Sequence, residues 1–165
     1  MGSPRIRLVL TSPDEMPTLR RLFDDPSFHG WGGASPLSDR ELAAKYAGDR
    51  LPEVETFIVE VDASPAGLAI LHDDGDRVGG MDLILLPSTR RRGIGRAVVA
   101  LLVERARDVR GWMRLTVDPD LSNEAGIRFW EAAGFRPLRE EPASEGREAF
   151  LLMEMVIAEV GGPER

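Results

Sequence analysis

Residues 82–96 read DLILLPSTRRRGIGR and contain the transition that decides the fold. The apolar run from Met81 to Leu86 has the length and composition of a β-strand, and a proline, three arginines and two glycines follow it. From Gly95 to Val109 apolar residues then recur at helical spacing. The segment therefore predicts a strand that leads into a helix through glycines.

The start of that helix has the properties of an anion site. The first turn of a helix leaves backbone N–H groups without internal partners and carries the positive end of the helix dipole. Glycines let a phosphate approach this backbone closely, and Arg90, Arg91, Arg92 and Arg96 add positive charge. The pattern predicts a phosphate-binding turn, with a solvated charge run as the alternative reading of the arginines alone.

Composition limits the classes of protein that fit. A length of 165 residues, 42% hydrophobic and 30% charged, is ordinary for one globular domain, so we expect a single domain over residues 1–165. The sequence shows neither a membrane span nor a secretion signal, which predicts a cytoplasmic protein without a membrane partner. The net charge of -7 disfavours nucleic acid and suits a cationic small molecule. Because the chain has no cysteine, disulfides and acyl-cysteine intermediates are excluded, and we expect no metal.

Hydrophobic periodicity predicts an α+β protein whose sheet has helices on both faces. Helices are expected from Pro13 with apolar Leu19, Leu22 and Phe23, from an Asp39 cap to Tyr46, at Gly95–Val109 and at Asn123–Ala133. The two histidines, His29 and His72, are expected at the surface in a loop and a turn. Edge strands near the C-terminus leave both a monomer and a homodimer open. Strands are expected at Ile6–Leu10, Thr56–Val61, Ala66–Leu71, Met81–Leu86, Trp112–Val117, Phe135–Glu140 and Glu148–Val156.

Two motifs together resemble the GCN5-related N-acetyltransferases (GNAT). Arg90-Arg91-Arg92-Gly93-Ile94-Gly95 fits that family's pattern Arg/Gln-x-x-Gly-x-Gly/Ala, and Leu115-x-Val117, Asn123 and Phe129-Trp130-x-x-x-Gly134-Phe135 are similar to its second motif. The resemblance covers roughly residues 55 to 157. It implies a mixed, mostly antiparallel central sheet of about seven strands with a splayed strand pair.

The same resemblance implies acetyl-CoA as the acetyl donor, with its diphosphate on the backbone of the glycine-containing turn. Backbone groups of Leu85 and Leu86 would pair with the pantetheine amides. Asn123 would reach the pantetheine arm, although a plain helix-capping role also fits it. The residues implied for the coenzyme are Leu85, Leu86, Arg90, Arg91, Arg92, Gly93, Ile94, Gly95, Arg96, Ala97, Asn123 and Trp130.

Acetyl transfer requires a neutral amine, so the site needs a group that takes a proton. Asp82, inside an apolar strand, is the first candidate, and Asp118, at the end of the next strand, is the second. As alternatives to a catalytic role, Asp82 could be a residue that faces solvent, and Asp118 could be a turn or cap residue. The missing cysteine favours direct attack of the amine in a ternary complex.

One family feature is absent. Many members of the family carry a tyrosine, which assists the departing thiolate, where this chain has Trp130. Because an indole N–H is not a practical acid, tyrosine-assisted departure is in doubt here. A thiol with an ordinary pKa of about 8.5 is a reasonable leaving group without such help.

Residues 29–53 resemble the acceptor region of aminoglycoside 6'-N-acetyltransferases. The resemblance implies that Trp31, Tyr46 and Glu53 line the acceptor pocket, and that Asp82, Asp118 and Glu145 complete an acidic surround for a polycationic amino sugar. A siderophore precursor, a polyamine and a peptide or protein amine are alternative acceptors. A non-catalytic acetyl-CoA-binding module is the alternative of another class.

Overall fold

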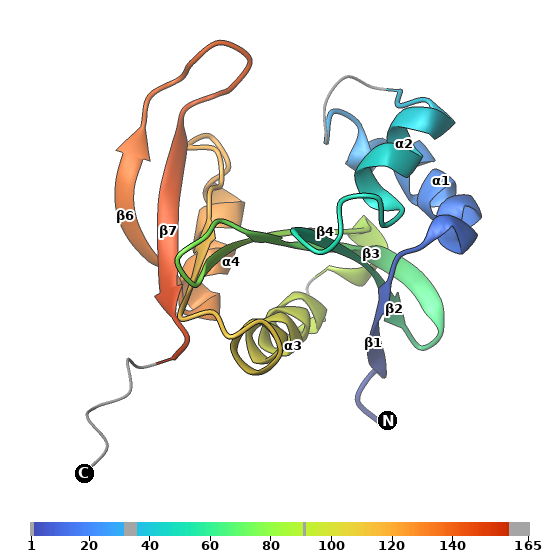
Figure 1. Ribbon diagram of the computed structural model, residues 1–165, viewed down its shortest axis with the longest axis horizontal. Helices are drawn as coiled ribbons and strands as arrows, with labels where there is room; N and C mark the ends of the chain where they lie inside the picture. Colours follow the sequence, from blue (N-terminus) through green and yellow to red (C-terminus); the bar gives the residue numbers. More distant parts are fainter. Residues whose placement is uncertain (1, 32–35, 91, 159–165) are drawn as a thin grey trace. The chain divides into compact units, whose positions relative to one another are not determined.

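The computed structural model describes residues 2–31, 36–90 and 92–158 (Figure 1). Short 3-10 turns occupy Pro13–Glu15, Pro26–Phe28 and Pro87–Thr89. The longer elements are β1 (Ile6–Leu10), α1 (Met16–Asp24), α2 (Asp39–Tyr46), β2 (Val54–Val61), β3 (Ser64–Asp73), β4 (Val78–Leu85), α3 (Ile94–Asp108), β5 (Arg114–Val117), α4 (Glu124–Ala133), β6 (Arg136–Glu141) and β7 (Phe150–Val156).

Within the described residues, seven strands hydrogen-bond in the order β1-β2-β3-β4-β5-β7-β6. The pairs β1–β2, β2–β3, β5–β7 and β6–β7 are antiparallel, whereas β4 and β5 are parallel. The β4–β5 register covers only Val78–Gly80 against Arg114–Thr116, although β4 continues to Leu85. The predicted α+β class and the mixed sheet with a diverging strand pair are confirmed.

The chain divides into two compact units, each described here by itself. The first comprises Met1–His72 with Asp82–Ala100, and the second comprises Asp73–Met81 with Leu101–Arg165. The single domain expected over residues 1–165 stays a prediction.

In the first unit, α1, α2 and one face of β2 and β3 share a hydrophobic cluster that includes Leu19, Phe28, Leu42, Ile58 and Leu68, each less than 4% exposed. Most consecutive positions of β2 and β3 are buried, so both faces of these strands are covered. The cluster fixes α2 against the strands. It therefore also fixes Tyr46, the last residue of α2.

In the second unit, Gly79 of β4 lies directly against the indole of Trp112. A Cβ on Gly79 would fall 2.1 Å from that six-membered ring, so this position of the strand requires glycine. Because glycine has low β propensity, the sequence pattern predicted a strand only from Met81, whereas β4 begins at Val78 and includes Gly79 and Gly80. The edge strand β6 is exposed along most of its length and carries Pro137 and four charged residues, which disfavour pairing with another strand.

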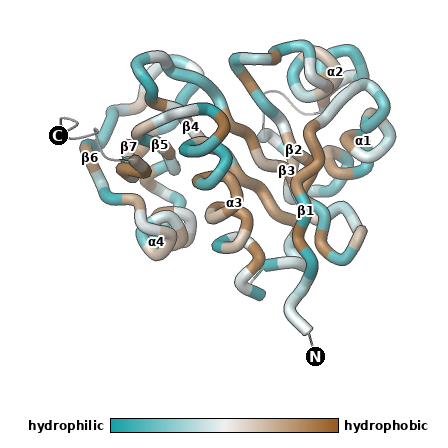
Figure 2. The backbone as a smooth tube through the Cα atoms, turned by 60° about the horizontal axis from the view of Figure 1, so that its bottom comes forward, coloured by the Kyte–Doolittle hydropathy of each residue, from teal (hydrophilic) through white to brown (hydrophobic). Residues whose placement is uncertain are grey.

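The predicted helices are confirmed: α2, α3 and α4 agree with the predicted bounds within one residue, and the helix expected from Pro13 begins as a 3-10 turn that leads into α1 at Met16. Figure 2 shows hydrophobic and hydrophilic residues alternating along α3, the pattern that predicted an amphipathic helix. Within the described residues, no helix combines the length and hydropathy that a membrane span requires.

Candidate functional site

A pocket of about 280 Å³ lies within the first unit. It is bounded by the residues that follow α1, by the C-terminal end of α2 and the turn after it, and by β2, β3 and β4. Its lining combines aromatic, apolar and charged side chains, which suits a small ligand held by a few polar contacts. The lining residues are Trp31, Tyr46, Arg50, Val54, Ile70, His72 and Asp82.

An aromatic stack forms one wall of the pocket. The ring centroids of Trp31 and Tyr46 are 5.8 Å apart and the ring planes differ by 12°. Phe23 supports both rings, with its centroid 4.9 Å from Tyr46 and 5.9 Å from Trp31. Trp31 and Tyr46, two of the three residues expected to line the acceptor pocket, therefore lie together.

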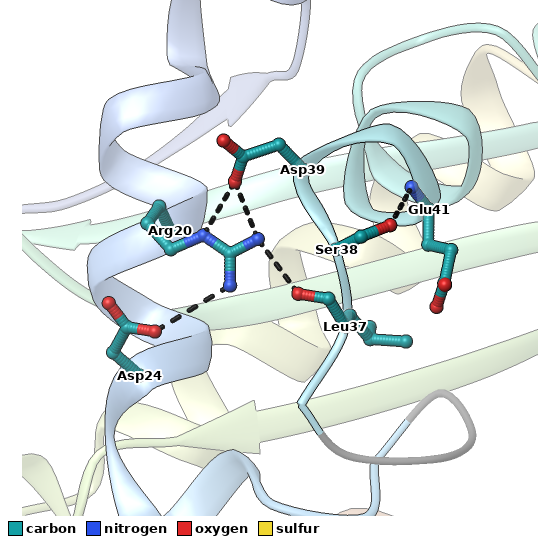
Figure 3. A network of polar contacts seen from close by, with 6 residues as sticks. All are labelled: Arg20, Asp24, Leu37, Ser38, Asp39 and Glu41. Atoms are coloured by element: carbon teal, nitrogen blue, oxygen red, sulfur yellow. Dashed lines mark hydrogen bonds and ion pairs between the residues drawn. The ribbon is translucent and has the colours of Figure 1, made fainter.

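Contacts at both ends of α2 hold Tyr46 in place. Figure 3 shows Arg20 of α1 donating to Asp39, at 2.9 Å from Nε and 2.7 Å from Nη2, and to the carbonyl of Leu37 at 2.9 Å. At the other end, buried Thr11 donates from its hydroxyl to the carbonyl of Tyr46. The helix that carries Tyr46 is thus hydrogen-bonded to α1 and to Thr11, the residue that follows β1.

The predicted helix cap at Asp39 was wrong. Ser38 is the N-cap, and its hydroxyl accepts a hydrogen bond from the backbone N–H of Glu41 (Figure 3). Asp39 is the first residue of the helix, and its carboxylate pairs with Arg20 instead. Serine and aspartate are similarly favoured at this position, so tertiary contacts made the choice.

The pocket lining contains a carboxylate, Asp82, and a guanidinium, Arg50, and both shift the pKa of Tyr46. Burial raises the pKa of the Tyr46 phenol above 10.0, the carboxylate of Asp82 raises it further, and Arg50 lowers it. Tyr46 is therefore a neutral phenol at physiological pH. Asp82 is half-buried and faces the pocket, so the expected solvent-facing alternative does not describe it.

His72 corrects a sequence-based prediction, because it was expected at the surface in an acidic turn. It lies inside β3, paired with Val54 of β2, and is half-buried in the pocket lining. The strand continues two residues beyond the predicted Leu71 because its ladder with β2 continues. His29, by contrast, is exposed as predicted. Sequence reasoning also missed Arg50, which precedes β2 in a turn that no local pattern connects to the pocket.

The acidic surround is smaller than expected. Glu53 is exposed and is not among the residues that line the pocket. Glu145 is exposed in the second unit. Among the residues that the structure describes, Asp82 is the one carboxylate in the pocket lining.

The turn before α3 has the geometry that a phosphate site requires. Gly93 has a φ of +74° and is exposed. Apart from its two chain neighbours, no described residue has an atom within 4 Å of the position that a Cβ would take. The helix begins at Ile94, and the carbonyl of Gly93 accepts its first bond, from the N–H of Ala97 at 3.2 Å. Arg90 and Arg92 are exposed beside it, and Arg91 lies outside the described residues. These residues fit a diphosphate, whose charge the helix N-terminus favours.

The backbone at the end of β4 is already hydrogen-bonded. The N–H of Leu86 donates to the carbonyl of Ala66 at 2.8 Å, and the carbonyl of Leu85 accepts from Nε of Arg90 at 3.1 Å. Thr89 donates to the carbonyl of Leu86 at 2.7 Å. In this structure the N–H of Leu86 is therefore paired with β3. Pairing of the Leu85 and Leu86 backbone groups with the pantetheine amides stays a prediction.

Two residues implied for the coenzyme lie in the second unit. Asn123 is the N-cap of α4, and its side chain accepts from the N–H of Gly126 at 2.9 Å, which fulfils the capping alternative. Trp130 is 8% exposed and packs edge-on against Phe129 and Phe135. These contacts are structural, and contact of either residue with the coenzyme stays a prediction.

Asp118, the second candidate base, is committed to an ion pair. Its carboxylate accepts from Nη2 of Arg147 at 2.6 Å, and the same guanidinium lies 3.6 Å from the ring centroid of Phe150. The ion pair links the residue that follows β5 to the segment before β7. A role of Asp118 as a proton acceptor stays a prediction. Among the described residues, no group of three or more histidines and carboxylates could hold a metal ion.

The comparison with protein families defines the class of protein. Residues 16–135 match the acetyltransferase (GNAT) family, so the chain belongs to this family. The chain is therefore an N-acetyltransferase that takes its acetyl group from acetyl-CoA. No curated protein matches the chain.

Solved structures confirm the fold. The aminoglycoside acetyltransferase AAC(6')-Ib in complex with coenzyme A is 23% identical, with a TM-score of 0.79 over 92% of this chain and 95% of that chain. A chimera of the Vibrio cholerae spermidine N-acetyltransferase and hSSAT is 16% identical, with a TM-score of 0.76 over 94% and 96%. At these identities the similarity establishes the shared fold.

Proposed function

We propose that this chain acetylates a primary amine of a cationic small molecule, an aminoglycoside-like amino sugar, by direct attack in a ternary complex with acetyl-CoA. The observation that carries the proposal is the position of Asp82 in a pocket walled by the Trp31–Tyr46 stack. A carboxylate forms charge-assisted hydrogen bonds with an ammonium group, and aromatic faces attract cations. The pocket therefore provides a carboxylate that pairs with an ammonium group and an aromatic surface on which it can pack.

The pocket residues have different roles in the proposed reaction. Asp82 binds the ammonium group and accepts its proton, which leaves the nitrogen lone pair free to attack. Val54 and Ile70 provide apolar surface, and the neutral phenol of Tyr46 can donate a hydrogen bond to a sugar oxygen. Attack of the nitrogen on the thioester carbonyl of acetyl-CoA forms the amide C–N bond and breaks the C–S bond. Coenzyme A leaves as the thiolate, which takes up the proton that the acetylated nitrogen loses. The turn from Arg90 to Arg96 binds its diphosphate, with Gly93 allowing close approach.

Related structures support the amino sugar as acceptor. AAC(6')-Ib has been solved with coenzyme A and kanamycin and with coenzyme A and ribostamycin, and these structures have TM-scores of 0.79 and 0.78 with this chain. The aromatic stack suits the apolar face of a sugar ring. Cytoplasmic residence remains part of the proposal.

A polyamine is the second candidate acceptor. The spermidine N-acetyltransferase structures, at 16% identity, are the observation that favours it. A narrow aromatic pocket with one carboxylate also suits the end of a linear amine.

Release of CoA thiol from acetyl-CoA, measured with a panel of kanamycin, ribostamycin, spermidine and a peptide amine, tests the proposal. We expect an amino sugar to give the highest kcat/KM, and mass spectrometry to show one added acetyl group. Asp82→Asn should lower kcat by about a hundredfold, because a base contributes that much. Asp49→Asn, an exposed carboxylate outside the pocket lining, is the matched control and should retain activity. Coenzyme binding without thiol release for any amine would instead identify a non-catalytic module.

A further inference from the structure

The charges in the pocket are balanced rather than acidic. Within the described part of the chain, the lining holds one carboxylate, Asp82, and one guanidinium, Arg50, while Glu53 is not part of it. Several carboxylates would be expected if the pocket had to hold a multiply charged group. The composition therefore points to a ligand with one positive charge inside the pocket.

Arg50 and Asp82 both interact electrostatically with the phenol of Tyr46. Tyr46 lies close enough to both that Asp82 raises the pKa of its phenol and Arg50 lowers it. A ligand packed on the Tyr46 ring is therefore within electrostatic range of both groups. At about 280 Å³ the cavity is near the small end of ligand pockets, which fits one sugar ring rather than a whole aminoglycoside.

We propose that Arg50 determines substrate specificity: the pocket accepts a sugar ring that carries a single ammonium group, and Arg50 disfavours a ring that carries two. Asp82 binds the one ammonium group. Arg50 donates hydrogen bonds to hydroxyl or ring oxygens of the same ring, since a guanidinium is a donor only. A second ammonium in place of a hydroxyl would lose these bonds and be repelled. This inference rests on the proposed function, because it assumes that the pocket takes the acceptor amine.

Two matched sugars test the inference: the methyl glycoside of a monoamino hexose, and its diamino counterpart with an amine in place of one hydroxyl. Dissociation constants are measured by calorimetry for the wild-type chain, Arg50→Gln and Arg40→Gln. Arg40 is an exposed arginine of α2 outside the pocket lining, so Arg40→Gln removes the same charge elsewhere in the same unit. Circular dichroism of each variant verifies the fold.

We expect the wild-type chain to bind the monoamino sugar about tenfold more tightly than the diamino sugar, and Arg50→Gln to reduce this ratio to about twofold or less. Arg40→Gln should keep the wild-type ratio. Equal affinities in the wild-type chain, an unchanged ratio in Arg50→Gln, or no binding of either sugar would each overturn the inference. Thiol release with the same sugars is measured separately, so selective binding without turnover would overturn the proposed function and leave the assignment of Arg50 intact.

Discussion

The indole of Trp31 lies parallel to the phenol ring of Tyr46, with ring centroids 5.8 Å apart and planes 12° apart. Trp31 comes from the loop after α1, and Tyr46 is the last residue of α2. The loop and the helix thus meet at one wall of the pocket. Phe23 packs against both rings, so the wall is built on the core of the unit rather than on a free loop.

Replacing Trp31 should weaken acceptor binding. A cation–π contact of about 1 to 2 kcal/mol corresponds to a rise in KM for the amine of about tenfold in Trp31→Ala, with a smaller change in kcat. Trp31→Phe keeps an aromatic face and should restore most of the loss. Steady-state kinetics at saturating acetyl-CoA measures both values. A fall in kcat with unchanged KM would mean that Trp31 does not contact the acceptor.

Tyr46 is the single tyrosine of the chain, so its ionisation can be read directly from phenolate absorbance. Burial, and then Asp82, raise its pKa above 10.0, so we expect no phenolate signal in the folded protein until the pH exceeds that value. Asp82→Asn should lower the pKa, and Arg50→Ala should raise it. The opposite order in the two variants would contradict the arrangement of the pocket.

The same shift has a consequence for alkaline stability. Because the folded-state pKa of Tyr46 is raised, the folded protein holds this proton more tightly than the unfolded chain does. The resulting stabilisation is present below the unfolded pKa of about 10 and is lost as the pH rises through the folded value. Urea unfolding across this window should show a steeper loss of stability in the wild-type chain than in Tyr46→Phe.

The capping box at the start of the first 3-10 turn predicts a second pH effect. Glu15 accepts hydrogen bonds from the backbone N–H and the hydroxyl of Ser12, at 2.8 and 2.7 Å, and the hydroxyl bond lowers its pKa below 4.5. Its contribution is therefore complete above pH 4.5 and is lost as the pH falls through the lowered value. Ser12→Ala should cost about 1 kcal/mol at neutral pH and less in acid. Equal losses at both pH values would show that the Glu15 carboxylate takes no part.

Most of the fold could be predicted because it follows from short-range patterns. Strand and helix periods, the Pro13 start and the Gly134 stop depend on neighbouring residues, and these elements are confirmed. The predictions that were wrong concern features that depend on tertiary pairing. The β2–β3 ladder extends β3 past its apolar run and thereby places His72 in the pocket.

The site could be predicted in part for the same reason. Asp82, Trp31 and Tyr46 follow from the strand phase and from the family resemblance, and they do line one pocket. Arg50 and Glu53 both lie shortly before the start of β2. Only the three-dimensional path of this turn decides which of them lines the pocket. The hydrogen bond from the N–H of Leu86 to the carbonyl of Ala66 could not be predicted from local sequence, because Ala66 lies on another strand.

Gly79 and Trp112 should behave as a coupled pair in unfolding experiments. A Cβ at position 79 would overlap the indole, so Gly79→Ala should destabilise the chain by about 1 to 3 kcal/mol. Trp112→Leu removes the ring that causes the overlap, so the loss from Gly79→Ala should shrink in that background. Chemical denaturation of the two single variants and the double variant measures the coupling. If the losses in the free energy of unfolding were additive, a Cβ at position 79 would not clash with the indole of Trp112.

Whether the turn before α3 binds the diphosphate of the coenzyme is measured by a calorimetric titration of coenzyme A. We expect saturable binding that is at least about a hundredfold tighter than that of pantetheine, which lacks the diphosphate. Gly93→Ala should weaken coenzyme binding, whereas Gly146→Ala, at an equally unobstructed glycine with a φ of +75°, should not. No binding of coenzyme A, equal binding of pantetheine, or equal effects of the two substitutions would contradict the account.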